Sequence, residues 1–382
     1  MSKLFSNYAR KSFEIVKGEG SYLWDDAGKK YLDFTAGIGV VNVGYHNQVV
    51  EEALAKQARL LWHTPNLYLN QLQEEVAAKL IGEKDYLAFF CNSGAEANEA
   101  AIKLARKATG KTKIITFLQS FHGRTYGSMS ATGQDSIHSG FAPLVPGFEY
   151  LPYNELAPLK AALDDDTAGV MLEVIQGEGG VLPANHSWLQ EVAKLCQEKG
   201  VLLIVDEIQT GMGRTGSLYA FEQFDIEPDI ITLAKGLGNG IPVGAMLGKQ
   251  NLGSAFGPGS HGSTFGGNKL AMAAASAVLD ELKADNFFQV IQAKSQLTFD
   301  FLAPLTKLSS IVEIRGQGLM IGIVCSEQLP VTQILAELEK QGILALRAGQ
   351  NVLRLLPPLT ISKEELVTGL TTIKAVIEQI AE

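Results

Sequence analysis

Short apolar runs alternate with longer amphipathic segments through the middle of the chain, and this alternation limits the possible folds more than any other feature. Residues 86–90, 113–118, 168–175 and 201–206 have the length and composition of strands, whereas 47–61, 95–109 and 187–200 have the period of helices. Strands that alternate with helices build a mostly parallel sheet with helices packed on its faces. We therefore predict an α/β fold with a mostly parallel sheet flanked by helices.

The alternation stops after a helix expected near 269–282, and the rest of the chain mixes strands and helices in a different order. Near the N-terminus, residues 21–34 have the pattern of a β-hairpin. A chain of 382 residues is long enough for more than one domain. We predict a large domain at 53–280 and a smaller α+β domain that combines 1–52 with 281–382.

Charge and cysteine content exclude several classes of function. The formal net charge is -9 and no basic run occurs, which argues against a nucleic-acid or membrane surface. Cys91, Cys196 and Cys325 are far apart in sequence, fitting neither a disulfide framework nor a zinc site. We expect a cytoplasmic protein with no bound metal, no signal peptide and no membrane span.

A lysine stands at the end of the apolar run 229–234. A cation avoids the protein interior unless it is paired, neutral or covalently used. Lys235 can simply reach solvent or meet a carboxylate, as most lysines at strand ends do. The alternative is a Schiff-base lysine, whose amine reacts with an aldehyde cofactor. Because ligands bind at the carboxyl ends of parallel strands, the position suits the second interpretation.

Two further strand ends carry residues that suit a ligand site. Asp206 follows the run 201–206, where a carboxylate can cap the next turn or face a cofactor. Ser93, Gly94 and Ala95 join a strand to a helix, and free N–H groups at a helix start attract phosphate. A serine cap beside a glycine turn is also common in ordinary helices. Each signal is weak alone.

Loops after strands supply aromatic and charged candidates. Phe121 could cover a flat ring and Arg124 could hold a carboxylate, although a core Phe and a surface Arg are equally plausible for this loop alone. Glu173 and Glu178 flank a glycine-rich turn after the apolar run 168–175. Arg354 lies in an apolar strand and needs a carboxylate from the protein or from a substrate.

These motifs occur in an order that resembles the class III pyridoxal-phosphate-dependent aminotransferases, and the resemblance covers nearly the whole chain. It rests on "NSGAEANEAAIKLAR", "SFHGRT", "EVIQGEGG", "LLIVDEIQTGMGRTG", "LAKGLGNGIPVGA" and "GSTFGGN". The resemblance implies the fold type I architecture of pyridoxal-phosphate-dependent transferases, usually a homodimer with its sites at the subunit interface. It also implies pyridoxal 5'-phosphate as the cofactor.

The resemblance implies roles for particular residues. Lys235 would be the Schiff-base lysine and proton shuttle, and Asp206 would pair with the pyridine nitrogen. Arg354 would hold a substrate carboxylate, with Glu178 as its switchable partner. The remaining cofactor contacts would come from Ser93, Gly94, Ala95, Phe121, Gln209 and, in the partner's site, Thr264. The remaining substrate contacts would come from Arg124 and Ser263.

Within the family, the likeness is greatest to members that act on N2-acetyl-L-ornithine, with 2-oxoglutarate as amino acceptor and L-glutamate as product, in arginine biosynthesis. Ornithine-specific members carry a tyrosine where this chain has Ile38, which suits an acylated nitrogen better. Succinylornithine, succinyldiaminopimelate, ornithine and 4-aminobutyrate remain alternatives. A glutamate-1-semialdehyde aminomutase shares the fold, and a cofactor-binding regulator would need a DNA-binding segment that the sequence lacks.

Overall fold

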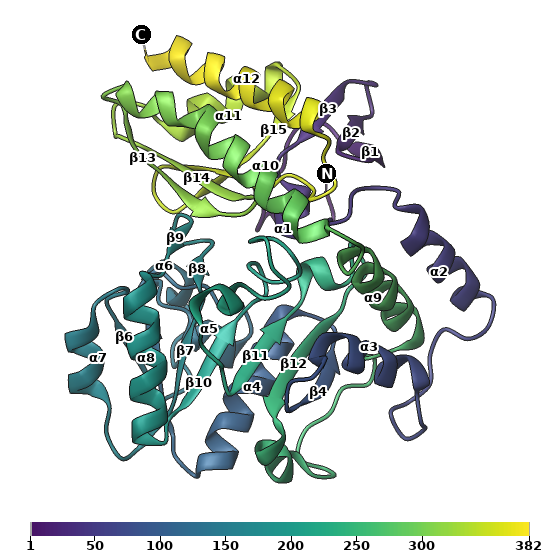
Figure 1. Ribbon diagram of the computed structural model, residues 1–382, viewed down its shortest axis with the longest axis vertical. Helices are drawn as coiled ribbons and strands as arrows, with labels where there is room; N and C mark the ends of the chain where they lie inside the picture. The colour runs from purple at the N-terminus through teal and green to yellow at the C-terminus, as the bar shows by residue number, and fades with distance from the viewer. Residues whose placement is uncertain (1, 382) are drawn as a thin grey trace.

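A seven-stranded sheet runs through the larger, lower part of the computed structural model, which describes residues 2–381 (Figure 1). β12 runs antiparallel to both its neighbours, and the other pairings are parallel. The prediction of a mostly parallel sheet is therefore confirmed. In spatial order the strands are β4 (Tyr86–Cys91), β12 (Gly244–Lys249), β11 (Ile230–Leu233), β10 (Leu202–Asp206), β7 (Thr167–Leu172), β5 (Lys113–Phe117) and β6 (Phe148–Leu151).

Both faces of this sheet are covered by helices. Ile204 of β10 packs in a cluster with residues of α4, whereas Leu203 and Val205 pack in a second cluster with residues of α8. Because successive side chains of a strand point to opposite faces, the two helices lie on opposite sides of the sheet. The helices of this part are α2 (Gln48–Ala58), α3 (Gln71–Ile81), α4 (Gly94–Thr109), α5 (Tyr126–Ala131), α6 (Asp135–His138), α7 (Leu156–Ala162), α8 (His186–Lys199) and α9 (Lys269–Leu282), with short helices η1 (Ala220–Phe224), η2 (Lys235–Leu237) and η3 (Gln250–Phe256).

Two four-stranded sheets lie beside the large one, and the first of them combines the two ends of the chain. In the first, Leu32 of β3 pairs in parallel with Ile343 of β15, so the N-terminal hairpin joins a C-terminal strand. Both four-stranded sheets lie within the predicted small domain, and the seven-stranded sheet lies within the predicted large domain. The domain boundaries themselves stay a prediction. The elements are β1 (Ile15–Glu19), β2 (Tyr22–Asp25), β3 (Lys30–Asp33) and β15 (Ile343–Leu344); β13 (Ile311–Gln317), β14 (Met320–Cys325), β17 (Val352–Leu355) and β16 (Leu346–Ala348); and helices α1 (Ala36–Gly39), α10 (Phe287–Leu302), η4 (Ala303–Lys307), α11 (Val331–Lys340) and α12 (Lys363–Ala381).

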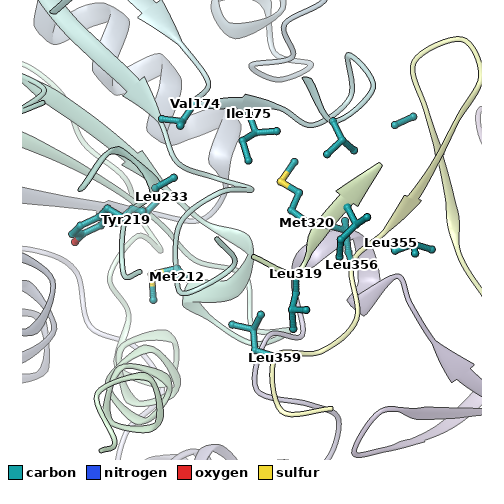
Figure 2. Close-up of a cluster of buried hydrophobic side chains, with 14 of the residues drawn as sticks. Val174, Ile175, Met212, Tyr219, Leu233, Leu319, Met320, Leu355, Leu356 and Leu359 are labelled. Atoms are coloured by element: carbon teal, nitrogen blue, oxygen red, sulfur yellow. The ribbon is translucent and has the colours of Figure 1, made fainter. Parts of the chain in front are cut away.

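The hydrophobic core is continuous between the large sheet and the C-terminal part. Figure 2 shows Met212 and Leu233, from the middle of the chain, in the same buried cluster as Leu319, Met320 and Leu355. Burying apolar surface stabilises by about 25 cal/mol per Å². This shared cluster therefore holds the small sheets against the carboxyl ends of the large one.

Two predicted elements end earlier than expected. The strand predicted at 168–175 stops at Leu172, because the Glu173 carboxylate accepts hydrogen bonds from neighbouring loops and the chain then enters a separate hairpin of β8 (Ile175–Gln176) and β9 (Leu182–Pro183). The helix predicted to reach residue 61 ends at Ala58. Within residues 2–381, no helix combines the length and the hydropathy needed to cross a membrane.

Candidate active site

A cavity of ≈ 400 Å³ opens at the carboxyl ends of the central strands. It is bounded by the segments that follow β4, β5, β10 and β11, as expected for a ligand site in a parallel sheet. A wider cavity of ≈ 970 Å³ shares some of its lining residues and includes Ile38. Nine residues predicted to bind cofactor or substrate line the first cavity: Ser93, Gly94, Ala95, Phe121, Arg124, Glu178, Asp206, Gln209 and Lys235.

The other three predicted site residues lie around this cavity and do not line it. Arg354 is buried and hydrogen-bonds to two lining residues, Glu178 and Gln209. The Ser263 hydroxyl accepts a hydrogen bond from Asn92, which lines the cavity, over 3.1 Å. Thr264 is exposed and contributes nothing to the cavity of its own chain.

Lys235 begins the short helix η2 directly after β11 and lines the cavity. Its backbone has φ 42°, in the left-handed region that residues other than glycine rarely adopt. The side chain is half-buried, and its Nζ has no hydrogen-bond partner among the described residues. Burial lowers the pKa of Lys235 to about 8, against the opposing charge of Glu178. The site therefore presents an amine that is easily neutral.

Asp206 ends β10 and is held by a buried network. His122 Nδ1 and Asn98 Nδ2 each lie 2.8 Å from its Oδ2, and the Ile208 backbone N–H donates to Oδ1 over 3.0 Å. Asn98 is fixed in turn by Thr232, whose hydroxyl donates to the amide oxygen over 2.7 Å. The carboxylate is thus oriented toward the cavity by groups on four different segments.

The start of α4 offers unpaired donors to the cavity. The Ser93 hydroxyl caps the helix by accepting from Glu96 N–H over 3.2 Å. The N–H groups of Gly94 and Ala95 have no hydrogen-bond partner within residues 2–381. A Cβ on residue 94 would lie 2.7 Å from the Ile208 side chain, so only glycine fits there without a shift. Free N–H groups at a helix start form a ready site for a phosphate group.

An ion pair joins Glu178 of the cavity lining to the buried Arg354 behind it. Arg354 Nη1 donates to Glu178 Oε1 over 2.6 Å and to Gln209 Oε1 over 3.1 Å. Burial on its own would raise the pKa of Glu178, but the charge and hydrogen bond of Arg354 and the charge of Lys235 lower it overall. The carboxylate therefore stays ionised at neutral pH, and Arg354 is neutralised by a group that a substrate carboxylate could replace.

Two residues with a clear place at the site had no assigned role in the sequence-based prediction. Glu173 accepts hydrogen bonds from Phe121 N–H over 2.9 Å and Gly177 N–H over 3.1 Å, so it joins two loops of the cavity. Burial raises the pKa of Glu173 to about 7. Asn98 orients Asp206 as described above. The signal for Asn98 was present, since a polar residue occupies the buried face of an amphipathic helix.

The donor set fits pyridoxal phosphate, the cofactor that the resemblance implies. The free N–H groups of Gly94 and Ala95 suit its phosphate, and the Asp206 carboxylate suits a protonated ring nitrogen. Phe121 offers an aromatic face on the cavity, with the Arg124 guanidinium 5.7 Å from its ring centroid. Lys235 supplies an amine for the aldehyde. These assignments stay proposals that variants can test.

Comparisons with known proteins agree with this chemistry. Residues 5–377 match the family described as aminotransferase class-III. The chain is 59% identical to the acetylornithine aminotransferase of Streptococcus mutans, covering 99% of this chain and 100% of that protein. Two solved structures are similar: an ornithine aminotransferase from Toxoplasma gondii, described with partial occupancy of pyridoxal phosphate at its active site (TM-score 0.94, 34% identity, 99% and 92% coverage), and an N-acetylornithine aminotransferase from Stenotrophomonas maltophilia (TM-score 0.84, 37% identity, 98% of each chain).

Proposed function

The chain belongs to the class-III aminotransferase family, and we propose that it transfers the distal amino group of N2-acetyl-L-ornithine to 2-oxoglutarate. The products are N-acetyl-L-glutamate 5-semialdehyde and L-glutamate, which places the reaction in arginine biosynthesis. One observation carries the reaction class: the amine of Lys235, the carboxylate of Asp206 and the free N–H groups of Gly94 and Ala95 line one cavity.

The proposed cofactor is pyridoxal 5'-phosphate. When bound, it supplies an aldehyde that condenses with amines and a protonated ring that accepts electrons from the substrate carbon. Gly94 and Ala95 would bind its phosphate through their N–H groups, and Phe121 would cover the ring. Gln209, which lines the cavity, would approach the oxygen on the ring. Asp206, held by His122 and Asn98, would keep the ring nitrogen protonated through its negative charge.

Lys235 has two proposed tasks at its Nζ atom. As a neutral amine it would hold the cofactor covalently, which its lowered pKa favours. When it is free, the Lys235 amine in the cavity would accept a proton from the substrate and return it. A general base works best when its pKa is near the working pH, and burial lowers the pKa of Lys235 in that direction.

The Arg354–Glu178 pair supports dual substrate specificity. Acetylornithine reacts at its distal amine, whereas glutamate reacts at its α-amine, so one site must accept two different groups beside the reacting carbon. Glu178 masks Arg354 while the distal amine is in place. When glutamate enters, its α-carboxylate would bind Arg354 in place of Glu178. The Nε atom of Arg354, buried without a partner among the described residues, adds a donor nearby.

The choice of acetylornithine rests on the full-length likeness to the S. mutans enzyme and on two side chains of the substrate region. Ile38 lines the wider cavity and offers no hydrogen bond to a free α-amino group. Arg124 lines both cavities and can hold the α-carboxylate, with Ser263 nearby. An acylated nitrogen is uncharged, so it can lie beside an isoleucine without a charged or hydrogen-bonding partner for an ammonium group.

We propose a homodimer that shares its sites. Exposed apolar side chains gather in the segment that contains Leu67 and Leu69, which are 87% and 99% exposed. Asn66 of the same segment donates hydrogen bonds to Ser263 O and Gly266 O, on either side of Thr264. Large exposed apolar patches mark interaction surfaces. If a second subunit binds to this patch, Thr264 of the first subunit would lie near the phosphate site of the second.

The three cysteines support a cytoplasmic setting for this reaction. Cys91, Cys196 and Cys325 are buried and unpaired, as expected in a reducing compartment. Because burial raises the pKa of all three thiols, they are poor nucleophiles at neutral pH.

A substrate panel tests the proposal. kcat/KM is measured with 2-oxoglutarate for acetylornithine, succinylornithine, ornithine and 4-aminobutyrate, and glutamate formation is followed directly. We expect acetylornithine to be the best substrate. A preference for ornithine or 4-aminobutyrate would overturn the substrate assignment, and turnover without net glutamate would indicate an aminomutase.

A further inference from the structure

The turn that carries Lys235 is strained and is contacted by a segment far away in sequence. Lys235 has φ 42° and Asn239 has φ 46°, both in the left-handed region. Such conformations persist only where the surrounding structure holds them, and they concentrate at functional sites. The groups that hold this turn come from residues 42–44 and from Arg214.

Asn42 packs directly against the residue after Lys235. A Cβ on Gly236 would lie 2.3 Å from Asn42 Nδ2 and 3.1 Å from Met212 Cβ, so the amide fills the space beside this backbone. The same Nδ2 donates to Met212 O over 2.9 Å. Asn42 therefore limits where the backbone at Lys235 and Gly236 can move.

Arg214 fixes Asn42 from behind. Its Nη2 donates to Asn42 Oδ1 over 2.6 Å, and its Nη1 donates to Leu319 O over 3.0 Å and to Pro357 O over 2.6 Å. The side chain is fully buried, and all of these partners are neutral oxygens. Burial lowers the pKa of Arg214 to about 9, against the charge of Asp33. A buried guanidinium without a carboxylate is costly, and an apolar side chain would cost less.

The neighbours of Asn42 hold the other end of the turn. Val43 N–H donates to Asn239 Oδ1 over 3.0 Å, and Asn239 Nδ2 donates to Gly44 O over 3.0 Å. Residues 42–44 thus contact both ends of the turn from 235 to 239. Neither Asn42 nor Arg214 lines either cavity of the site.

We propose that Arg214 and Asn42 are a pair of positioning residues that hold Lys235 in its reactive conformation. The proposal rests on the proposed function, because it assumes that Lys235 binds the cofactor. Since neither side chain reaches the cavity, their loss should impair the reactivity of Lys235 and leave the affinity for substrate nearly unchanged. Misplacing a reacting group by about 1 Å can slow a reaction roughly a hundredfold.

The test compares Asn42→Ala and Arg214→Met with Asn351→Ala. Asn351 is a matched control because its amide also joins backbone segments, donating to Ser326 O over 2.7 Å and Leu329 O over 3.0 Å, but away from Lys235. Four quantities are measured: the Kd for pyridoxal phosphate, the pH midpoint of the yellow absorbance of the loaded protein, kcat and KM for acetylornithine, and the unfolding temperature.

For Asn42→Ala and Arg214→Met we expect a shifted pH midpoint, a Kd raised about tenfold and a kcat lowered about ten- to a hundredfold, with KM within about twofold of wild type. Asn351→Ala should lower only the unfolding temperature. If Asn42→Ala behaves like Asn351→Ala, the positioning role is overturned. If the wild-type protein itself develops no yellow absorbance with pyridoxal phosphate, the proposed function fails instead.

If Arg214→Met does not fold, a substitution at Gly236, the other partner of the contact with Asn42, tests the same proposal. Gly236→Ala would press its Cβ against Asn42 Nδ2, so it should give the same spectroscopic shift. Combining it with Asn42→Ala removes the clash and should restore part of the lost kcat relative to Gly236→Ala alone. A double variant no better than Gly236→Ala would contradict coupling through this contact.

Discussion

Arg354 Nη1 donates a hydrogen bond to Glu178 Oε1 over 2.6 Å, at the wall of the cavity that Lys235 lines. The Arg354 side chain is buried, and the Glu178 side chain is half-buried. A carboxylate from outside can bind Arg354 only by displacing this partner. The competition between Glu178 and a substrate carboxylate is therefore built into the site.

Glu178→Ala should favour glutamate over acetylornithine. Removing the Glu178 carboxylate frees Arg354 to bind the α-carboxylate of glutamate. It also leaves the Arg354 cation unpaired near the distal amine of acetylornithine, which is a cation as well. Hydrogen bonds to charged groups are worth about 1.5–3 kcal/mol, so the ratio of the two half-reaction rates should shift by about tenfold or more. Glu313→Ala, which breaks a pair with Arg315 outside the cavity, is the control. Equal changes in both pre-steady-state rates would contradict the masking role.

Lys235→Ala should lose the yellow absorbance of the bound cofactor and nearly all turnover. In the unchanged protein, borohydride should bleach that absorbance by reducing the bond to Lys235. Lys294→Ala is a suitable control, because burial also lowers the pKa of Lys294 but its amine donates to Leu359 O and does not line the cavity. A Lys235→Ala protein that stays fully active would refute the assignment.

Attachment of the cofactor should become faster as pH rises from about 6 to about 8. The neutral amine is the nucleophile, and the pKa of Lys235 is lowered from 10.5 to about 8. At pH 7 about a tenth of the molecules then carry a neutral amine, compared with about 0.03% for an unshifted lysine. Rates of absorbance gain by the cofactor-free protein, measured across this range, report the midpoint. A rate still rising steeply at pH 9 would show that the pKa is not lowered in this way.

Asp206→Ala should still bind the cofactor but lose at least about a hundredfold in kcat. The substitution removes the charge that keeps the ring nitrogen protonated, and oriented charges of this kind typically contribute 10²–10³ in rate, a rough figure. Asp229→Ala is the control, because Asp229 lies at the opposite end of the neighbouring strand and pairs with Lys249 over 3.0 Å. Near-normal kcat in Asp206→Ala would leave Asp206 as a structural cap only.

Mixing two inactive variants should restore activity if the site is shared. Thr264→Asp would place a negative charge beside the partner's phosphate, whereas Lys235→Ala disables only its own site. In a mixed dimer one site then carries both defects and the other carries none. Random exchange makes about half of the dimers mixed, so about a quarter of wild-type activity should return.

The mixing experiment needs proof of subunit exchange, for example by co-purification of differently tagged chains. With exchange confirmed, an absence of rescue would mean that Thr264 does not serve the partner's site. A Thr264→Asp protein that is fully active alone would remove Thr264 from the site altogether.

Much of the architecture could be predicted because it depends on local pattern. The strand ending at Asp206 and the helix at 95–109 were expected from their apolar patterns, and the helix does end at Thr109, before Gly110 with φ 70°. Residues at the carboxyl ends of parallel strands must meet at one edge, so Lys235 and Asp206 could be brought together without coordinates.

The partners of these residues could not be predicted in the same way. Asn98 reaches Asp206 across 108 positions of sequence, and Arg214 reaches Asn42 across 172. No periodicity records which of many polar side chains will meet across such distances. The role of Glu173 could not be predicted either. The apolar run continues past this residue, and only the hydrogen bonds of its carboxylate end the strand.

The parallel pairing of Leu32 with Ile343 has a consequence for the order of assembly during synthesis. Chains grow at roughly 5–20 residues per second, so the outer edge of β3 waits roughly 15–60 s for its partner strand. The Arg214 contact with Pro357 is completed even later. An unpaired strand edge invites pairing with other chains, so this interval is when the newborn chain is most prone to aggregate. The turn at Lys235 acquires its last support only after Pro357 has been made, and no nascent chain that stops before this residue can hold a complete site.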